Sequence, residues 1–124
     1  MRAHAVRLRR VYDPVEPEDG TRVLIDRLWP RGLSREKAAV DIWLKEIAPS
    51  DKIRREFGHD RRRWPHFAAA YRAELASNPA ALEQLLALCD DGQVTLLYAA
   101  HDTECNNAVV VAAVLEGRDP APHG

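Results

Sequence analysis

Apolar residues along the chain gather in short runs that polar or turn-forming residues separate. Two runs, residues 22–27 and 94–99, are nearly continuous and rich in β-branched or aliphatic side chains, which is typical of strands buried on both faces. Residues 4–12 alternate more loosely and predict a strand with one partly solvated face. Residues 40–47 fit either a strand or a helix, and their alternating aliphatic side chains favour a strand.

Five further segments either carry apolar side chains at helical spacing or begin with a helix-capping residue. The predicted helices span residues 35–38, 51–57, 62–77, 79–90 and 105–116. Ser34 is expected to cap the first, Ser50 or Asp51 the second, and Asn78 the fourth. Residues 13–20 contain two prolines and an Asp-Gly pair, and they predict an exposed loop.

This alternation of strands and helices predicts a single layered α/β domain over residues 1–124, with a small, mostly parallel β-sheet flanked by helices. Residues 4–117 are expected to form the ordered core and residues 118–124 a frayed tail. No apolar run approaches about 18 residues, so a membrane span and a membrane partner are excluded. The first seven residues lack the apolar core of a signal peptide, and the chain has two cysteines. We therefore expect a cytoplasmic protein.

Charge is balanced overall but unevenly placed along the chain, whose formal net charge is −1. Residues 1–72 carry a net charge of +6, whereas residues 73–124 carry −7. Such asymmetry indicates either an anion-binding face or two halves that neutralise each other in space, and we favour the second interpretation.

Strands 22–27 and 94–99 are the expected central pair, and ligands of parallel sheets bind beyond the carboxyl ends of the strands. The loop after the first strand offers a carboxylate, two guanidiniums and an indole, from Asp26, Arg27, Arg31 and Trp29. Two arginines this close suit bidentate binding of a phosphate or carboxylate. The alternative is structural, with an Asp–Arg pair holding the loop and the indole covering the core.

The loop after the second strand is equally polar. His101 suits a general base near neutral pH, and Asn106 and Asn107 suit helix caps or ligand contacts. The alternative is that Asp102 or Thr103 is an ordinary helix cap and His101 an ordinary loop histidine.

Cys105 stands where a helix N-terminus would lower the pKa of its thiol and favour nucleophilic catalysis, although an inert residue is the alternative. Its spacing of four from His101 supplies two possible metal ligands, but a zinc site needs three or four, so no metal site is predicted.

Residues 54–64 are basic with interleaved aromatic side chains, a pattern that can bind nucleic acid. The chain has a pI of about 6.5 and no DNA-binding signature, so a solvated helix face is favoured.

Five motifs follow one another in a distinctive order: DRLWPRG at 26–32, WLKEIAPS at 43–50, His59-Asp60 before Arg63-Trp64, VTLLYAA at 94–100, and NNA at 106–108. Together they resemble the YeaO-like family, bacterial proteins that carry domain of unknown function 488. The resemblance covers about residues 6–115. It implies a small cytoplasmic α/β domain and no established reaction. The family pattern usually has His where this chain has Cys105, which weakens any mechanism that needs a general base at this position.

We expect a protein that binds or acts on a small anionic ligand, phosphorylated or nucleotide-like, at the carboxyl edge of its sheet. The candidate catalytic side chains are Asp26, His101, Asp102 and Cys105. The candidate ligand-binding side chains are Arg27, Trp29, Arg31, Lys45, Glu46, His59, Trp64, Tyr98, Asn106 and Asn107. A nucleic-acid-binding or regulatory module that uses residues 54–63, and a protein-interaction domain, are the alternatives. Whether the protein is an enzyme, and with which cofactor, stays open.

Overall fold

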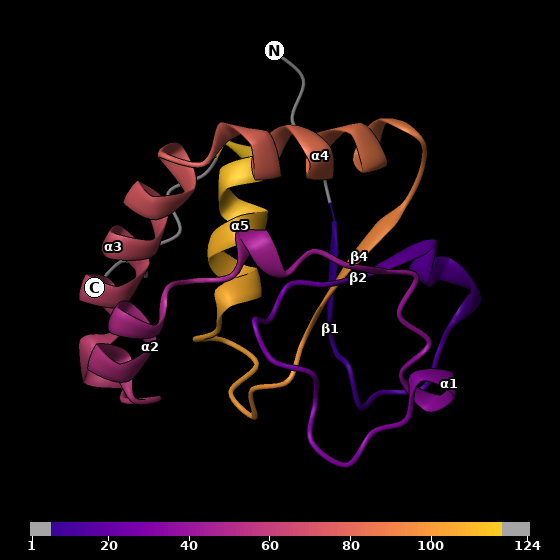
Figure 1. Cartoon of the computed structure of the whole chain (residues 1–124), viewed down its shortest axis with the longest axis horizontal. Coiled ribbons are helices and arrows are strands. Elements are labelled where there is room, and N and C mark those ends of the chain that lie inside the picture. Colours follow the sequence, from indigo (N-terminus) through magenta and orange to yellow (C-terminus); the bar gives the residue numbers. More distant parts are fainter. Residues whose placement is uncertain (1–5, 118–124) are drawn as a thin grey trace.

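Four parallel strands form one sheet in the computed structural model, which describes residues 6–117 (Figure 1). The strands are β1 (Arg7–Arg10), β2 (Thr21–Leu24), β3 (Ile42–Trp43) and β4 (Val94–Tyr98). Their order is β1-β4-β2-β3, and each neighbouring pair is parallel. The predicted α/β fold is confirmed, with β2 and β4 as the central strands. The predicted frayed tail, residues 118–124, lies outside the described residues.

Five helices accompany the sheet within the described part of the chain. They are α1 (Arg35–Ala38), α2 (Asp51–Phe57), α3 (Trp64–Ala76), α4 (Pro79–Asp90) and α5 (Asn107–Glu116). Helix α5 packs against β4 and β1 on one side and against α3 on the other, and α2 lies beside α3 (Figure 1). No helix among residues 6–117 is long and apolar enough to cross a membrane.

The two faces of the sheet are covered differently. On the first face, strand residues such as Val23 and Leu96 join apolar side chains of α3 and α5 in the main core. On the second face, Leu24 and Leu97 form a smaller cluster with Ala38 of α1. The central strands are therefore buried on both faces, which is why their sequences read as continuous apolar runs.

Residues 40–47 differ from the predicted strand. β3 covers two residues, and Lys45–Ile47 forms a 3-10 turn directly after it. Leu44 and Ile47 are both buried. A turn brings side chains three positions apart to the same side, whereas a strand would point them to opposite faces. The last helix also begins later than predicted, at Asn107, because Asn106 is its N-cap.

The predicted exposed loop, residues 13–20, contains one deeply buried acid. Asp19 is 1% exposed, and its carboxylate accepts hydrogen bonds from Arg7, Arg9 and Arg22. These arginines project from β1 and β2 onto the second face of the sheet. The loop folds back over that face because its carboxylate neutralises the charge that the strands place there.

Candidate functional site

Asp26 joins the carboxyl ends of the two central strands. Its Oδ2 accepts a hydrogen bond from the Ala99 N–H at 2.9 Å, just beyond β4. Its Oδ1 accepts one from Asn107 Nδ2 at 2.9 Å, and the same amide nitrogen donates to the Ile25 carbonyl at 3.2 Å. The Trp43 indole also donates to the Asp26 carbonyl at 2.7 Å. The polar segments that follow β2 and β4 therefore meet in space, as the sheet topology predicts.

Burial raises the pKa of Asp26 above its usual value. The hydrogen bonds from Asn107 and Ala99, and the nearby charges of Arg54 and His59, oppose this rise only in part. Because both carboxylate oxygens already accept hydrogen bonds from the protein, the side chain acts as a brace between the loops.

Two residues that the sequence analysis did not select strengthen the same edge. At the end of β1, Arg10 donates to the carbonyls of Ala99 and Ala100 at 3.2 and 2.9 Å. The Tyr12 hydroxyl donates to the Arg31 carbonyl at 3.0 Å. The backbone of both loops is therefore anchored from a third strand. No motif in the sequence signals this, since Arg10 and Tyr12 contact residues 19 to 90 positions away.

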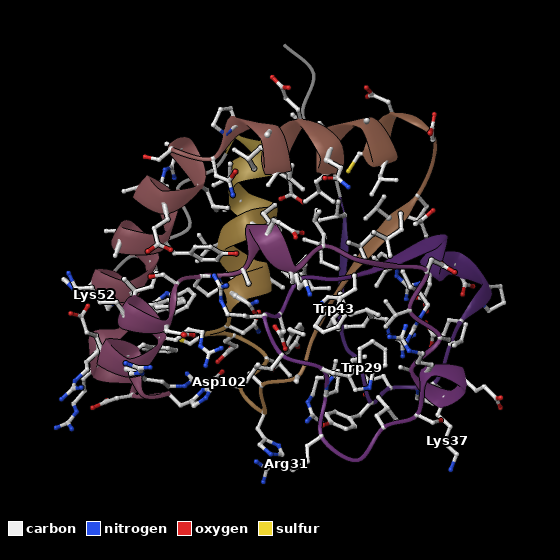
Figure 2. All side chains as sticks on the ribbon, viewed as in Figure 1. Trp29, Arg31, Lys37, Trp43, Lys52 and Asp102 are labelled. Carbon is white, nitrogen blue, oxygen red and sulfur yellow. The ribbon has the colours of Figure 1, made fainter. Side chains whose placement is uncertain are left out.

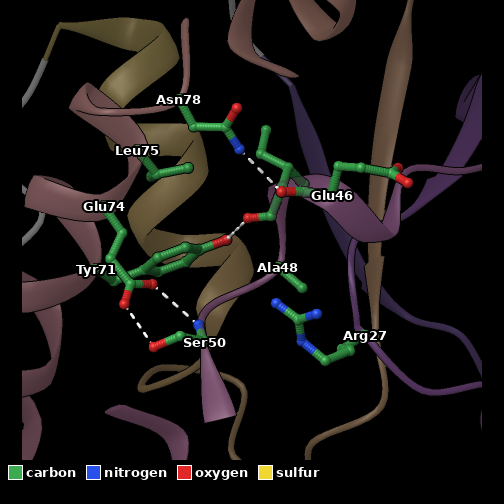
Figure 3. A pocket seen from close by; sticks show the side chains of 9 residues that line it. Arg27, Glu46, Ala48, Ser50, Tyr71, Glu74, Leu75 and Asn78 are labelled. Carbon is green, nitrogen blue, oxygen red and sulfur yellow. Dashed lines mark hydrogen bonds between the residues drawn. The ribbon is translucent and has the colours of Figure 1, made fainter. Parts of the chain in front are cut away.

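Arg27 and Arg31, predicted to clamp one anion, face different surroundings. Figure 2 shows Arg31 at the outer tip of its loop, and its guanidinium has no hydrogen-bond or ion-pair partner within residues 6–117. Arg27 lines a pocket of about 190 Å³, into which its guanidinium points (Figure 3). Its nearest acidic partner is Asp51, whose Oδ1 lies 3.9 Å from the Arg27 Nε.

Hydrogen bonds hold the walls of this pocket (Figure 3). The Tyr71 hydroxyl donates to the Ile47 carbonyl at 2.6 Å. The Ser50 N–H and hydroxyl donate to the two carboxylate oxygens of Glu74 at 2.9 and 2.5 Å. Asn78 Nδ2 donates to the Glu46 carbonyl at 2.9 Å. Hydrogen-bonded residues of α3, of the 3-10 turn and of the positions that precede α2 and α4 thus line the pocket.

Most residues of this pocket carry no functional signal in the sequence. Ser50 and Asn78 stand at the predicted N-cap positions of α2 and α4, but their side chains make no capping hydrogen bond and instead bond to Glu74 and the Glu46 carbonyl. Glu74 carries no sequence signal, because a single acid on the polar side of a helix is ordinary. Burial, together with the charges of Asp26 and Glu74, raises the pKa of Tyr71 well above its usual value, so its hydroxyl stays protonated.

The two indoles expected to wall a ligand site lie elsewhere. Trp64 is 1% exposed and packs against Phe57 and Phe67 in the main core. Trp29 meets Trp43 edge-on, with ring centroids 5.4 Å apart, at the smaller cluster (Figure 2). Trp64 therefore packs in the main core and Trp29 against the smaller cluster, and neither indole lines the Arg27 pocket.

The remaining predicted ligand-binding residues are scattered. Lys45 lies over the Trp43 ring, 4.9 Å from its centroid, while Glu46 lines the Arg27 pocket. His59 is exposed, adopts a positive φ of 57° and lies beside the Phe57 ring. Tyr98 is buried at the end of β4, where burial raises the pKa of its hydroxyl.

Asp102 and Asn106 organise the turn before α5. The Asp102 carboxylate accepts hydrogen bonds from the Glu104 and Cys105 N–H groups and from Arg61. Burial alone would raise the pKa of Asp102, but these bonds outweigh it and lower the pKa overall. Asn106 Oδ1 accepts from the backbone N–H three residues on and caps the helix. Of the two predicted roles for Asn106, helix capping is the one that the structure has, and the alternative that Asp102 or Thr103 caps the helix is wrong.

Cys105 differs from the predicted activated thiol. It is 7% exposed, and burial and the Asp102 charge raise its pKa, whereas activation would lower it. The helix begins two residues later, at Asn107.

His101 is exposed and makes no hydrogen bond or ring contact with another described residue. Within residues 6–117, no three His, Cys, Asp or Glu side chains are grouped closely enough to hold a metal ion.

The basic segment around α2 and α3 is largely paired with acids. Arg61 donates to Asp102 and Glu104 at 2.8 and 2.9 Å, and Arg62 pairs with Asp60 at 3.0 Å. Acids from the second half of the chain thus neutralise part of this segment. The pairs of Arg61 join the two oppositely charged halves of the chain, whereas Arg62 pairs within the first half.

Comparisons with known proteins agree on one family. The model of the inactive DUF488-N3 subclade matches residues 5–120. An uncharacterised protein of Mycobacterium tuberculosis is 39% identical over 118 residues, which cover 95% of this chain and 99% of the relative. The uncharacterised Escherichia coli protein YeaO is 41% identical over 107 residues, which cover 86% of this chain and 93% of the relative. No solved structure matches significantly. The chain therefore belongs to the YeaO-like DUF488 family of bacterial proteins.

Proposed function

We propose that this protein binds a small anionic ligand through Arg27, at the pocket beside the carboxyl end of β2, and that it binds this ligand without converting it. The observation that carries the proposal is the Arg27 guanidinium, which points into a pocket of about 190 Å³ and donates no hydrogen bond to a described residue (Figure 3). A guanidinium offers five N–H donors in a planar fork that matches a carboxylate or phosphate.

The Arg27–Asp51 contact leaves this guanidinium available. The pair is separated by 3.9 Å, and the side chains are 43% and 54% exposed. Ion pairs of this kind contribute little free energy, because water and salt screen them. A ligand anion that forms two short hydrogen bonds would therefore outcompete Asp51 for Arg27.

Binding without turnover fits the candidate catalytic residues. Asp26 braces the two loops through its bonds to Ala99 and Asn107, Asp102 is paired with Arg61, and the Cys105 thiol is buried with a raised pKa. The matched subclade is described as inactive, and the proposal extends that description to this chain. Both cysteines are free thiols, which suits the cytoplasm, the location we propose.

A thermal-shift panel tests the proposal with phosphate, acetate, dicarboxylates, sugar phosphates and nucleotides on the wild type and on Arg27→Gln. A ligand at 100 times its Kd stabilises the folded state by about 2.7 kcal/mol, which raises the Tm by roughly 10 °C in a domain of this size. We expect a shift that Arg27→Gln abolishes. Arg55→Gln is the matched control, because Arg55 is exposed on α2 and has no partner among residues 6–117.

Two outcomes would contradict the proposal. The first is the absence of a shift with any anion in the panel. The second is a shift that survives Arg27→Gln but disappears with Arg31→Gln, because this would locate the anion at the loop tip. Binding to nucleic acid that weakens steeply with salt and needs residues 54–63 would support the alternative function.

A further inference from the structure

We propose that the ligand is a zwitterion of amino-acid size, whose anionic end pairs with Arg27 and whose protonated amine pairs with Glu74. This inference rests on the proposed function and names the class of ligand for the same pocket. It is carried by Arg27 and Glu74, two opposite charges that line one pocket without forming an ion pair with each other. Glu46 also lines the pocket, but its carboxylate points away from Tyr71 and Glu74 (Figure 3).

Glu74 is a partly buried carboxylate without a counter-charge. Its described hydrogen bonds both come from Ser50, a neutral residue, and no Lys, Arg or His among residues 6–117 lies within ion-pair distance. Partly buried carboxylates usually gain a cationic partner, because burial weakens their interaction with water. A ligand amine at the pocket would supply this missing positive charge.

Glu74 also keeps free acceptor positions. Each carboxylate oxygen has two lone-pair directions, and each accepts one hydrogen bond from Ser50. An ammonium group has three N–H donors, so it can use both Glu74 oxygens. The Tyr71 hydroxyl is fully buried and is used by the Ile47 carbonyl.

The size and lining of the pocket restrict the ligand further. A volume of about 190 Å³ is below the range of about 300–1,000 Å³ that holds drug-sized molecules. Ile47, Ala48 and Leu75 add apolar surface to the lining. A short aliphatic chain between the two charged ends fits this combination.

Isothermal titration calorimetry tests the inference with three zwitterions of increasing length, glycine, β-alanine and γ-aminobutyrate. Their matched anions are acetate, propionate and butyrate. We expect one zwitterion to bind at least about tenfold more tightly than its matched anion, the gain typical of a charged hydrogen bond. This comparison uses the wild-type protein, so it stays decisive even where a variant fails to fold.

Two variants assign the contacts. Glu74→Gln keeps the shape of the side chain but removes its charge, and it is expected to abolish the roughly tenfold preference for the zwitterion over its matched anion. Arg27→Gln is expected to weaken both. Their thermal unfolding in the absence of ligand checks that each variant is folded.

The results separate this inference from the proposed function. Anion binding that depends on Arg27, without any gain for a zwitterion, would overturn the inference and leave the proposed function standing. Zwitterion binding that is unchanged in Glu74→Gln would also overturn it. If none of the six compounds binds, the inference is overturned, and the proposed function then depends on the wider anion panel.

Discussion

Replacing Asp19 by Asn removes the negative charge at the centre of a buried ionic cluster. Arg22 Nη1 donates to Asp19 Oδ2 at 2.6 Å, and the two side chains are 3% and 1% exposed. Arg7 and Arg9 reach the same carboxylate at 3.0 and 3.3 Å. The variant therefore leaves a guanidinium buried without its charged partner. We expect the free energy of unfolding to fall by about 3–5 kcal/mol, the usual cost of breaking a buried ion pair.

Urea unfolding at pH 7 measures this loss, and Glu16→Gln is its matched control. Glu16 pairs with Arg7 at 2.7 Å, but its side chain is 45% exposed. An exposed pair contributes about 0–1 kcal/mol, so the control should lose far less stability than Asp19→Asn. A loss below about 1 kcal/mol in Asp19→Asn would refute the reasoning, because it would mean that solvent reaches Arg22 freely.

The same cluster predicts a pH dependence. Burial alone would raise the pKa of Asp19, but the Glu16 N–H and the Arg22 and Arg9 guanidiniums lower it overall. A carboxyl group with a lower pKa in the folded than in the unfolded state stabilises the fold above its unfolded value of about 3.9. This stability is lost as the pH falls through the folded value. Asp19→Asn should lose that part of the acid sensitivity.

Three further predictions concern other parts of the chain. Gly20→Ala should destabilise the fold by more than about 1 kcal/mol in urea unfolding, because φ is +61° and the new Cβ would lie 2.2 Å from the Gln93 carbonyl oxygen. An unchanged free energy of unfolding in Gly20→Ala would mean that the turn rearranges to accommodate the new Cβ. Tyr71→Phe should cost about 1–3 kcal/mol, since it leaves the Ile47 carbonyl without its donor. Cys105 should react with iodoacetamide at pH 7 more slowly than free cysteine, measured by mass spectrometry, because burial raises its pKa. An equal rate would contradict this.

Local sequence patterns predicted the sheet well, since β2 and β4 are buried on both faces and each carries a continuous apolar run. The same patterns predicted the polar loops after β2 and β4, which Asp26 joins. It failed at Lys45–Ile47, where a strand-like alternation folds into a turn because Leu44 and Ile47 both have to reach the core.

The candidate site was less predictable, because its key contacts join distant positions. Ser50 and Glu74 are 24 residues apart, and so are Ile47 and Tyr71. Ser50 stands where a helix cap is expected, so its local context pointed to capping. Arg27 and Arg31 lie in one loop and were predicted to bind one anion together, yet Arg27 lines the pocket and Arg31 does not.

An NMR titration with acetate and with phosphate tests whether an anion binds at Arg27, because it locates the anion on the chain. The account predicts saturable shifts of the Arg27 side-chain N–H and of the Ala48 and Ser50 amides, which belong to residues lining the pocket. The amides of residues 59–63 should stay unchanged. Shifts confined to residues 54–63, or none that saturate at Arg27, would contradict the account.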